Sequence, residues 1–123
     1  MKALTVRQPW AGAIFELGKD VENRSWTTPY RGTILIHAGA VLWGTGKTIK
    51  NLREEPSWSV GAIIGAVELV DVVKSFHSPW AQSDCWNWVF ADATVFDKSI
   101  PAKGAMGLWE TSTELTKSVC DLL

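Results

Sequence analysis

Long apolar runs are missing from this sequence of 123 residues, and their absence excludes the common membrane classes. The longest candidate, Gly61 to Val67, ends at Glu68 and is far shorter than the ~20 residues that a membrane helix needs. The first residues also lack the apolar stretch of a signal peptide. We therefore expect a cytoplasmic protein that has no membrane partner.

Cysteine and histidine are equally scarce. Cys85 and Cys120 have no second cysteine or histidine at ligand spacing, and the two histidines are His37 and His77. Zinc sites and disulfide frameworks are built from clusters of such residues. We therefore expect reduced thiols, no metal and no cofactor. Because His37 ends a strongly apolar segment, we expect it to be a hydrogen-bonded structural histidine.

Tryptophan is abundant and the charge is unevenly distributed. The chain has eight tryptophans, so we expect at least one to line a pocket and not only the core. Net charge is −1, but residues 1–53 hold eight basic and three acidic residues, whereas residues 54–123 hold four and ten. This asymmetry favours an anionic partner for the basic half. The alternative is that the two halves interleave in one fold, so that the surface charge averages out.

The hydrophobic pattern predicts more strands than helices. Apolar periodicity predicts a helix from Trp10 to Leu17 that Gly18 ends, a short helix over 45–53, and a last helix capped by Ser112 or Thr113. The predicted strands cover 2–6, 33–38, 60–73, 86–91, 94–96 and 108–111, with a bend or bulge at Gly61 and Gly65. This content predicts an α+β fold in which one domain, residues 1–123, forms a small mixed or antiparallel β-barrel with two or three flanking helices.

The segment 18–26 combines two cations, two acids, an amide and a tryptophan in nine residues. If residues 21–26 are extended, Glu22, Arg24 and Trp26 share one face. Side by side, a carboxylate can accept from an exocyclic amine, a guanidinium can contact phosphate or a base edge, and an indole can stack. The alternative is a solvated strand edge whose opposite charges pair with their neighbours.

Several segments, in order along nearly the whole chain, carry a family resemblance. They are Gln8-Pro9-Trp10-Ala11, Lys19-x-x-Glu22-x-Arg24, Tyr30-Arg31-Gly32, 34–38, 61–71, 88–92 and 101–109. Together they resemble an ASCH domain, the activating-signal-cointegrator homology family, which is related to the PUA-like fold. The family signature places one residue between its glycine and lysine, whereas Gly18 directly precedes Lys19 here. The resemblance implies a PUA-like barrel with the signature lining a cleft.

The resemblance also implies a ligand, because PUA domains bind RNA. We expect RNA or a modified nucleobase, with DNA as a further option. In this interpretation Lys19, Arg24 and Arg31 meet phosphate or base oxygens, and Glu22 accepts from an amine. Trp26 stacks on a base, together with Trp10 or Tyr30, and Arg7 extends the basic rim.

An enzymatic alternative follows from the same resemblance, since one bacterial branch of the family hydrolyses the amide of N4-acetylcytidine. A metal-independent hydrolase of a modified nucleoside or of RNA would use Lys19 as general base, Glu22 or Glu68 as proton relay, and Tyr30 as acid. That branch carries a threonine where this sequence has Glu22, so its nucleophile is missing here. A purely structural signature is the third option, and the oligomeric state stays open.

Overall fold

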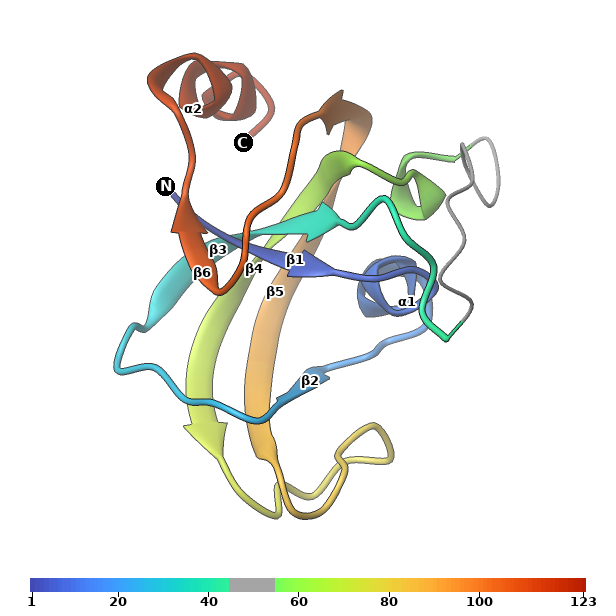
Figure 1. The fold of residues 1–123 in the computed structure, drawn as a ribbon, viewed down its shortest axis with the longest axis vertical. Helices are drawn as coiled ribbons and strands as arrows, with labels where there is room; N and C mark the ends of the chain where they lie inside the picture. The colour runs from blue at the N-terminus through green and yellow to red at the C-terminus, as the bar shows by residue number, and fades with distance from the viewer. Residues whose placement is uncertain (45–54) are drawn as a thin grey trace.

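The computed structural model describes residues 1–44 and 55–123, and their centre is a mixed sheet curled into a half-barrel (Figure 1). Across this sheet the strands follow the order β2-β5-β4-β3-β1-β6. The expected α+β fold with a small barrel-type sheet is confirmed, and the helix expected over 45–53 lies outside the described residues. The described elements are β1 (Lys2–Val6), α1 (Trp10–Glu16), β2 (Val21–Arg24), β3 (Gly32–Ala38), the 3-10 helix η1 (Pro56–Trp58), β4 (Ala62–Val73), β5 (Trp86–Pro101), β6 (Leu108–Glu110) and α2 (Thr113–Cys120).

Strand pairing interleaves the two halves of the sequence. Among the described strands, only β1 and β3 are parallel neighbours, with Ala3 opposite Leu35. The first half also contributes β2, which pairs with β5 from the second half, and β1 also pairs with β6. The basic and acidic halves therefore form one sheet and are not separate bodies.

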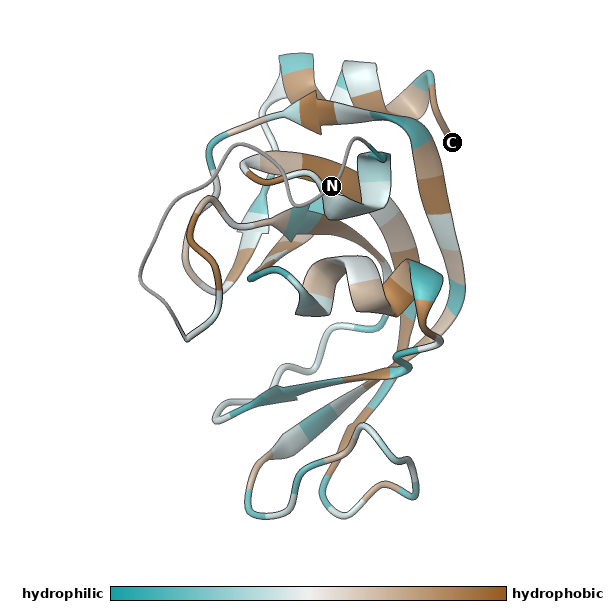
Figure 2. Ribbon diagram, turned by 90° about the vertical axis from the view of Figure 1, so that its right-hand side faces the viewer, coloured by the Kyte–Doolittle hydropathy of each residue, from teal (hydrophilic) through white to brown (hydrophobic). Residues whose placement is uncertain are grey.

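Two apolar clusters lie on opposite faces of the sheet, because successive residues of a strand point to opposite sides. Ile34 and Ile36 of β3 belong to the cluster that contains Ile14 of α1. Leu35, between them, belongs to the cluster that contains Val119 of α2. Each helix thus closes a different face, and Figure 2 shows hydrophobic residues along the strands between them.

The ends of both helices agree with the sequence. Gly18 follows α1 with a φ of 68°, a left-handed conformation that glycine adopts at little cost. The hydroxyl of Ser112 accepts a hydrogen bond from the backbone N–H of Leu115 at 3.1 Å and caps α2.

In the part of the chain that the structure describes, no helix has the length and apolar character to cross a membrane.

The prediction of two separate strands at 86–91 and 94–96 is wrong, because β5 is continuous over both. Asp92 and Ala93, which lie between the two predicted strands, form a β-bulge. Ala91 and Thr94 of β5 are three residues apart, whereas their partners Glu68 and Ala66 on β4 are two apart. Asp92 has a φ of 52°, which aspartate tolerates better than most residues. The sequence pattern at this β-bulge therefore predicts the end of a strand, although β5 continues through it.

The irregularity expected in the glycine-containing strand is confirmed at Gly65, where the register of β4 shifts against both neighbouring strands. A Cβ at this position would lie 2.5 Å from the carbonyl oxygen of Thr94 and 2.6 Å from the ring of Phe15. Only a residue without a side chain lets β4, β5 and the end of α1 approach this closely.

Replacing Gly65 by alanine should therefore destabilise the fold. We expect Gly65→Ala to lower the free energy of unfolding by roughly 1–3 kcal/mol, because the backbone of Thr94 cannot move aside cheaply. Gly39→Ala is the matched control, since a Cβ there would make an ordinary contact of 3.4 Å with Thr5. Urea denaturation of both variants measures the difference, and equal losses would contradict this account.

Candidate functional site

The segment that follows α1 is held in place by backbone hydrogen bonds at both ends. The N–H groups of Leu17 and Lys19 both donate to the carbonyl oxygen of Ala13, at 2.9 and 3.2 Å. The carbonyl of Asp20 accepts the N–H of Phe90 at 2.9 Å, and β2 then pairs along β5. The reversal at Gly18 thus delivers Lys19 to the start of an extended strand.

Lys19, Glu22 and Arg24 form a connected group that we call the charged triad. Lys19 Nζ donates to Glu22 Oε1 at 3.0 Å and to the carbonyl oxygen of Val21. Arg24 Nη2 donates to Glu22 Oε2 at 2.9 Å and to the carbonyl oxygen of Thr5 at 2.7 Å. Each carboxylate oxygen of Glu22 therefore accepts from a different cation. Glu22 and Arg24 share a face of β2, as expected for strand residues two positions apart, whereas Lys19 reaches Glu22 from the segment before the strand.

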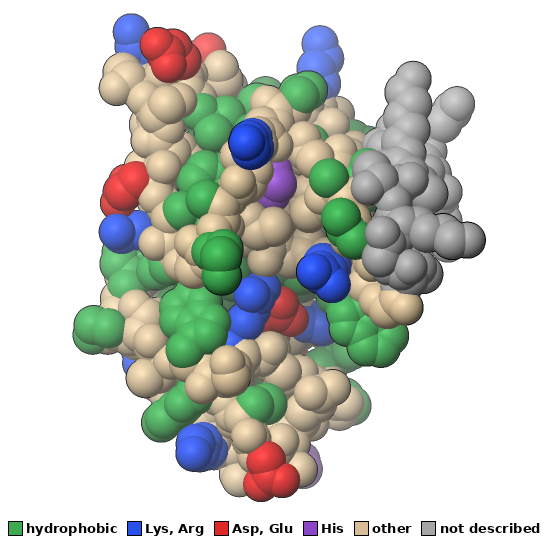
Figure 3. Space-filling view, viewed as in Figure 1, with side chains coloured by type: hydrophobic (Ala, Val, Ile, Leu, Met, Phe, Trp, Pro, Cys, Tyr) green, Lys and Arg blue, Asp and Glu red, His purple; other side chains and the backbone are tan. Residues whose placement is uncertain are grey.

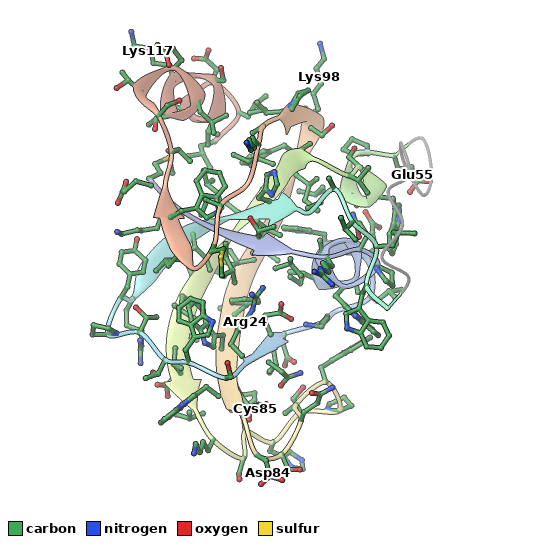
Figure 4. The ribbon with its side chains drawn as sticks, in the orientation of Figure 1. Arg24, Glu55, Asp84, Cys85, Lys98 and Lys117 are labelled. Atoms are coloured by element: carbon green, nitrogen blue, oxygen red, sulfur yellow. The ribbon has the colours of Figure 1, made fainter. Side chains whose placement is uncertain are left out.

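The charged triad carries two cations and one carboxylate, so one positive charge is left over. Solvent exposure rises along it: the side chains of Lys19, Glu22 and Arg24 are 4%, 13% and 24% exposed. Among the described residues, Arg24 Nε has no hydrogen-bond partner. Figure 3 shows charged side chains gathered in a hollow at the centre of one face, and Figure 4 labels Arg24 in the same region. The excess charge therefore meets solvent at the Arg24 guanidinium.

The tryptophans expected to stack are packed edge-on against other tryptophans. Trp26 lies against Trp88 with ring centroids 4.7 Å apart, and Trp88 Nε1 donates to the carbonyl oxygen of Trp26 at 3.1 Å. Trp10 lies 5.5 Å from Trp43 in the same manner. Trp26 and Trp10 are partly buried against the core, whereas Trp43 is 58% exposed. Sequence analysis did not single out Trp43, because nothing in the sequence ranks the eight tryptophans by exposure.

Tyr30 and Arg31 lie in the turn before β3 and are engaged locally. The Tyr30 hydroxyl donates to the carbonyl oxygen of Thr33 at 2.8 Å. Arg31 Nη1 donates to the carbonyls of Thr28 and Tyr30 at 2.8 and 2.7 Å, and its Nη2 lies 3.6 Å from the Asp71 carboxylate. Arg7 is exposed just after β1.

Glu68 lies on the other face of the sheet from the charged triad. Its neighbours Val67 and Leu69 belong to the α1-side cluster, so its own side chain points away and accepts from the Thr33 hydroxyl. Glu22 is paired directly opposite Trp88, which belongs to the α1-side cluster. The structure therefore brings together Lys19, Glu22 and Arg24 but leaves Glu68 apart from them.

A second polar network, which sequence analysis did not identify, adjoins the charged triad through Thr5. Besides the Thr5 carbonyl that binds Arg24, the Thr5 hydroxyl accepts from Trp109 Nε1 at 3.1 Å and lies 3.2 Å from His37 Nδ1. His37 Nε2 donates to the Ala102 carbonyl at 2.7 Å. A single threonine within an apolar strand gives no sequence signal for such a role.

His37 is a hydrogen-bonded structural histidine, as expected, and its burial favours the neutral form. Its side chain is buried, and desolvation lowers its pKa below the usual value, while the hydrogen bond to Ala102 opposes this effect. A carbonyl oxygen only accepts, so Nε2 carries a proton, and in the neutral ring Nδ1 therefore faces Thr5 as an acceptor.

Metal ligands do not cluster in the structure. Within residues 1–44 and 55–123, no three histidine, cysteine, aspartate or glutamate side chains are grouped so that they could hold a metal ion. Cys85 and Cys120 are both free thiols.

The curled mixed sheet with one helix on each face is an α+β fold of the PUA-like barrel type. A family model described as "ASCH domain" matches residues 4–100, so the chain belongs to the ASCH domain family. This family is usually linked to RNA binding.

Two named relatives contain a similar segment. The chain is 37% identical to activating signal cointegrator 1 of Homo sapiens and 28% identical to the protein of that name from Mus musculus, each over 133 aligned positions. Each alignment covers 91% of this chain but 22% of the relative. The chain therefore spans less than a quarter of the length of these relatives.

Removing the inner cation of the charged triad should cost stability. We expect Lys19→Met to lower the free energy of unfolding by about 3 kcal/mol, because Glu22 keeps its burial but loses one of two partners. Lys2→Met is the control, since Lys2 pairs with Glu110 at 2.9 Å where both are far more exposed, and its loss should be much smaller. Similar losses in the two variants would argue against a stabilising role for the triad.

The lowered pKa of His37 makes stability depend on pH. Unfolded histidine titrates near ~6.5, so below that pH the unfolded chain binds a proton that the folded chain resists. Stability should be full above this pH and fall as the solution is acidified through it. We expect His37→Gln to flatten the dependence measured by urea denaturation, whereas the exposed His77→Gln should keep it. An unchanged slope in His37→Gln would refute the assignment.

Proposed function

We propose that this ASCH domain binds single-stranded RNA, or a modified nucleobase, through the charged triad. The observation that carries the proposal is the unbalanced positive charge, which Glu22 and the Thr5 carbonyl fix at the exposed end of the triad on Arg24. A cation held in one place by two acceptors binds an anionic group without first losing its own rotational freedom. Membership of a family usually linked to RNA binding supports the same ligand class.

The three side chains of the charged triad take different roles because they differ in solvent exposure. Arg24 uses Nη2 for both protein contacts and its Nε is buried, which leaves Nη1 for phosphate oxygens or a base edge. Lys19 is too buried to reach a strand directly, so its charge acts by orienting Glu22. Glu22 keeps unused lone pairs with which to accept from an exocyclic amine.

Aromatic stacking favours an unpaired strand over a duplex. Bases can stack on a side chain only when they are splayed out of a helix, and each such contact contributes ~1–3 kcal/mol. Trp43 offers an exposed ring supported by Trp10, close to the start of α1.

The hydrolase alternative has weaker support. A general base needs a free lone pair near the substrate, whereas Lys19 Nζ donates to two acceptors and is 4% exposed. Glu68 lies on the other face of the sheet and Tyr30 bonds to Thr33, so the proposed relay and acid are not beside Lys19. We therefore expect no cleavage of N4-acetylcytidine.

Binding of a short fluorescein-labelled single-stranded RNA, followed by anisotropy, tests the proposal. We expect Arg24→Gln to raise the Kd by about tenfold or more, and Arg24→Lys to recover part of the loss because it keeps the charge but not the planar fork. Lys98→Gln removes the same charge from an exposed site that Figure 4 shows far from Arg24, and it should change the Kd little. The Kd of the native protein should rise with salt.

Two outcomes would count against the proposal. If Arg24→Gln and Lys98→Gln have the same effect, the RNA responds to overall charge and not to the triad. If a DNA strand of the same sequence binds more tightly than the RNA, the ligand is DNA.

A further inference from the structure

A hollow of about 350 Å³ lies where segment 102–106 crosses the ends of the parallel strands β1 and β3. We call it the 102–106 hollow. It is lined by Thr5, His37, Gly39, Ala40 and Gly61 together with that segment. Its size falls within the ~300–1,000 Å³ typical of small-ligand sites.

The 102–106 hollow adjoins the charged triad on one side and the exposed tryptophan on the other. Thr5 lines it, and the carbonyl of Thr5 accepts from Arg24. Gly39 also lines it, and a Cβ on Gly39 would lie 3.7 Å from Arg7 Cγ. The backbone N–H of Trp43 donates to the carbonyl oxygen of Gln8 at 2.9 Å, and Gln8 is the residue that follows Arg7. Thr5 therefore contacts Arg24 and also lines the hollow, and Gly39 lines the hollow next to Arg7.

The walls of the 102–106 hollow suit a flat ring that carries an anionic group. Of the described residues that line it, Lys103 is charged and none is acidic. Met106 is 96% exposed at its edge, and a methionine side chain packs favourably against aromatic rings.

The floor of the hollow is fixed. A Cβ on Gly104 would lie 2.7 Å from both His37 Cε1 and Thr5 Oγ1, so the backbone of the crossing segment rests directly on these side chains. The hydrogen bond from His37 to Ala102 anchors the start of the same segment. A ligand therefore meets a preformed surface of peptide groups.

We propose that the 102–106 hollow is a subsite for one unpaired nucleotide. The base lies against Met106 and the peptide groups of the segment, and Lys103 and Arg7 neutralise its phosphate. The neighbouring nucleotide on one side reaches Arg24, and the neighbouring nucleotide on the other side reaches Trp43. The inference rests on the proposed function and deepens it by naming where a single nucleotide is held.

Adenosine 5′-monophosphate is the probe for this subsite, followed by NMR on isotope-labelled protein. We expect the largest shifts at the amides of Gly39 and Gly104 and at the His37 ring. Ribose 5-phosphate, which lacks the base, should shift these signals much less. No shift at these signals, or equal shifts with both compounds, would overturn the proposal.

Ala40→Glu provides the matching variant, because Ala40 is exposed and lines the hollow. A carboxylate there should raise the Kd for the nucleotide by about tenfold. Ala93→Glu adds the same charge at an exposed position of β5 outside the lining, and its Kd should match the native value. A native Kd in Ala40→Glu would overturn the proposal.

The RNA measurement separates the two proposals. If Arg24→Gln abolishes RNA binding while nucleotide shifts and the Ala40→Glu effect are both absent, the subsite is refuted and the proposed function stands. If the nucleotide shifts the hollow signals and Ala40→Glu blocks it while Arg24→Gln leaves RNA binding intact, the subsite is supported and the role of the triad is refuted.

Discussion

The carboxylate of Glu22 is the constraint on which the candidate site depends. A largely buried carboxylate is costly unless its oxygens are paired, and here Lys19 and Arg24 each satisfy one of them. Both cations are held in turn by backbone carbonyls, that of Val21 for Lys19 and that of Thr5 for Arg24. The acid thus fixes the end of α1, strand β2 and strand β1 relative to one another. It also determines which cation faces solvent.

Much of this arrangement could be predicted from local sequence, because it depends on local periodicity. Alternation in an extended segment placed Glu22 and Arg24 on one face, and their shared hydrogen bonds agree. The cap at Ser112 likewise follows from a short-range rule. The continuous β5 could not be predicted, because a bulge at Asp92 is determined by the register against β4, which is a long-range property.

Exposure was the other property that the sequence could not supply. The side chain of Lys19 is 4% exposed and bonded to two acceptors, and the residue type alone does not reveal that. The role of Thr5 is even harder to predict from sequence, since its carbonyl bonds to Arg24 and its hydroxyl bonds to Trp109. Its partners, Arg24 and Trp109, come from distant parts of the chain. Such roles depend on strand order, which local patterns do not encode.

The position of β1 has a consequence for how the domain forms. The first strand of the described domain lies inside the sheet, between β3 and β6, and β6 lies more than one hundred residues later in sequence. The sheet therefore cannot close until almost the whole domain has left the ribosome, and contacts so distant in sequence slow folding because a long loop must be closed first. Until then β1 carries an unpaired edge, which is the part of the nascent chain most open to pairing with a wrong partner.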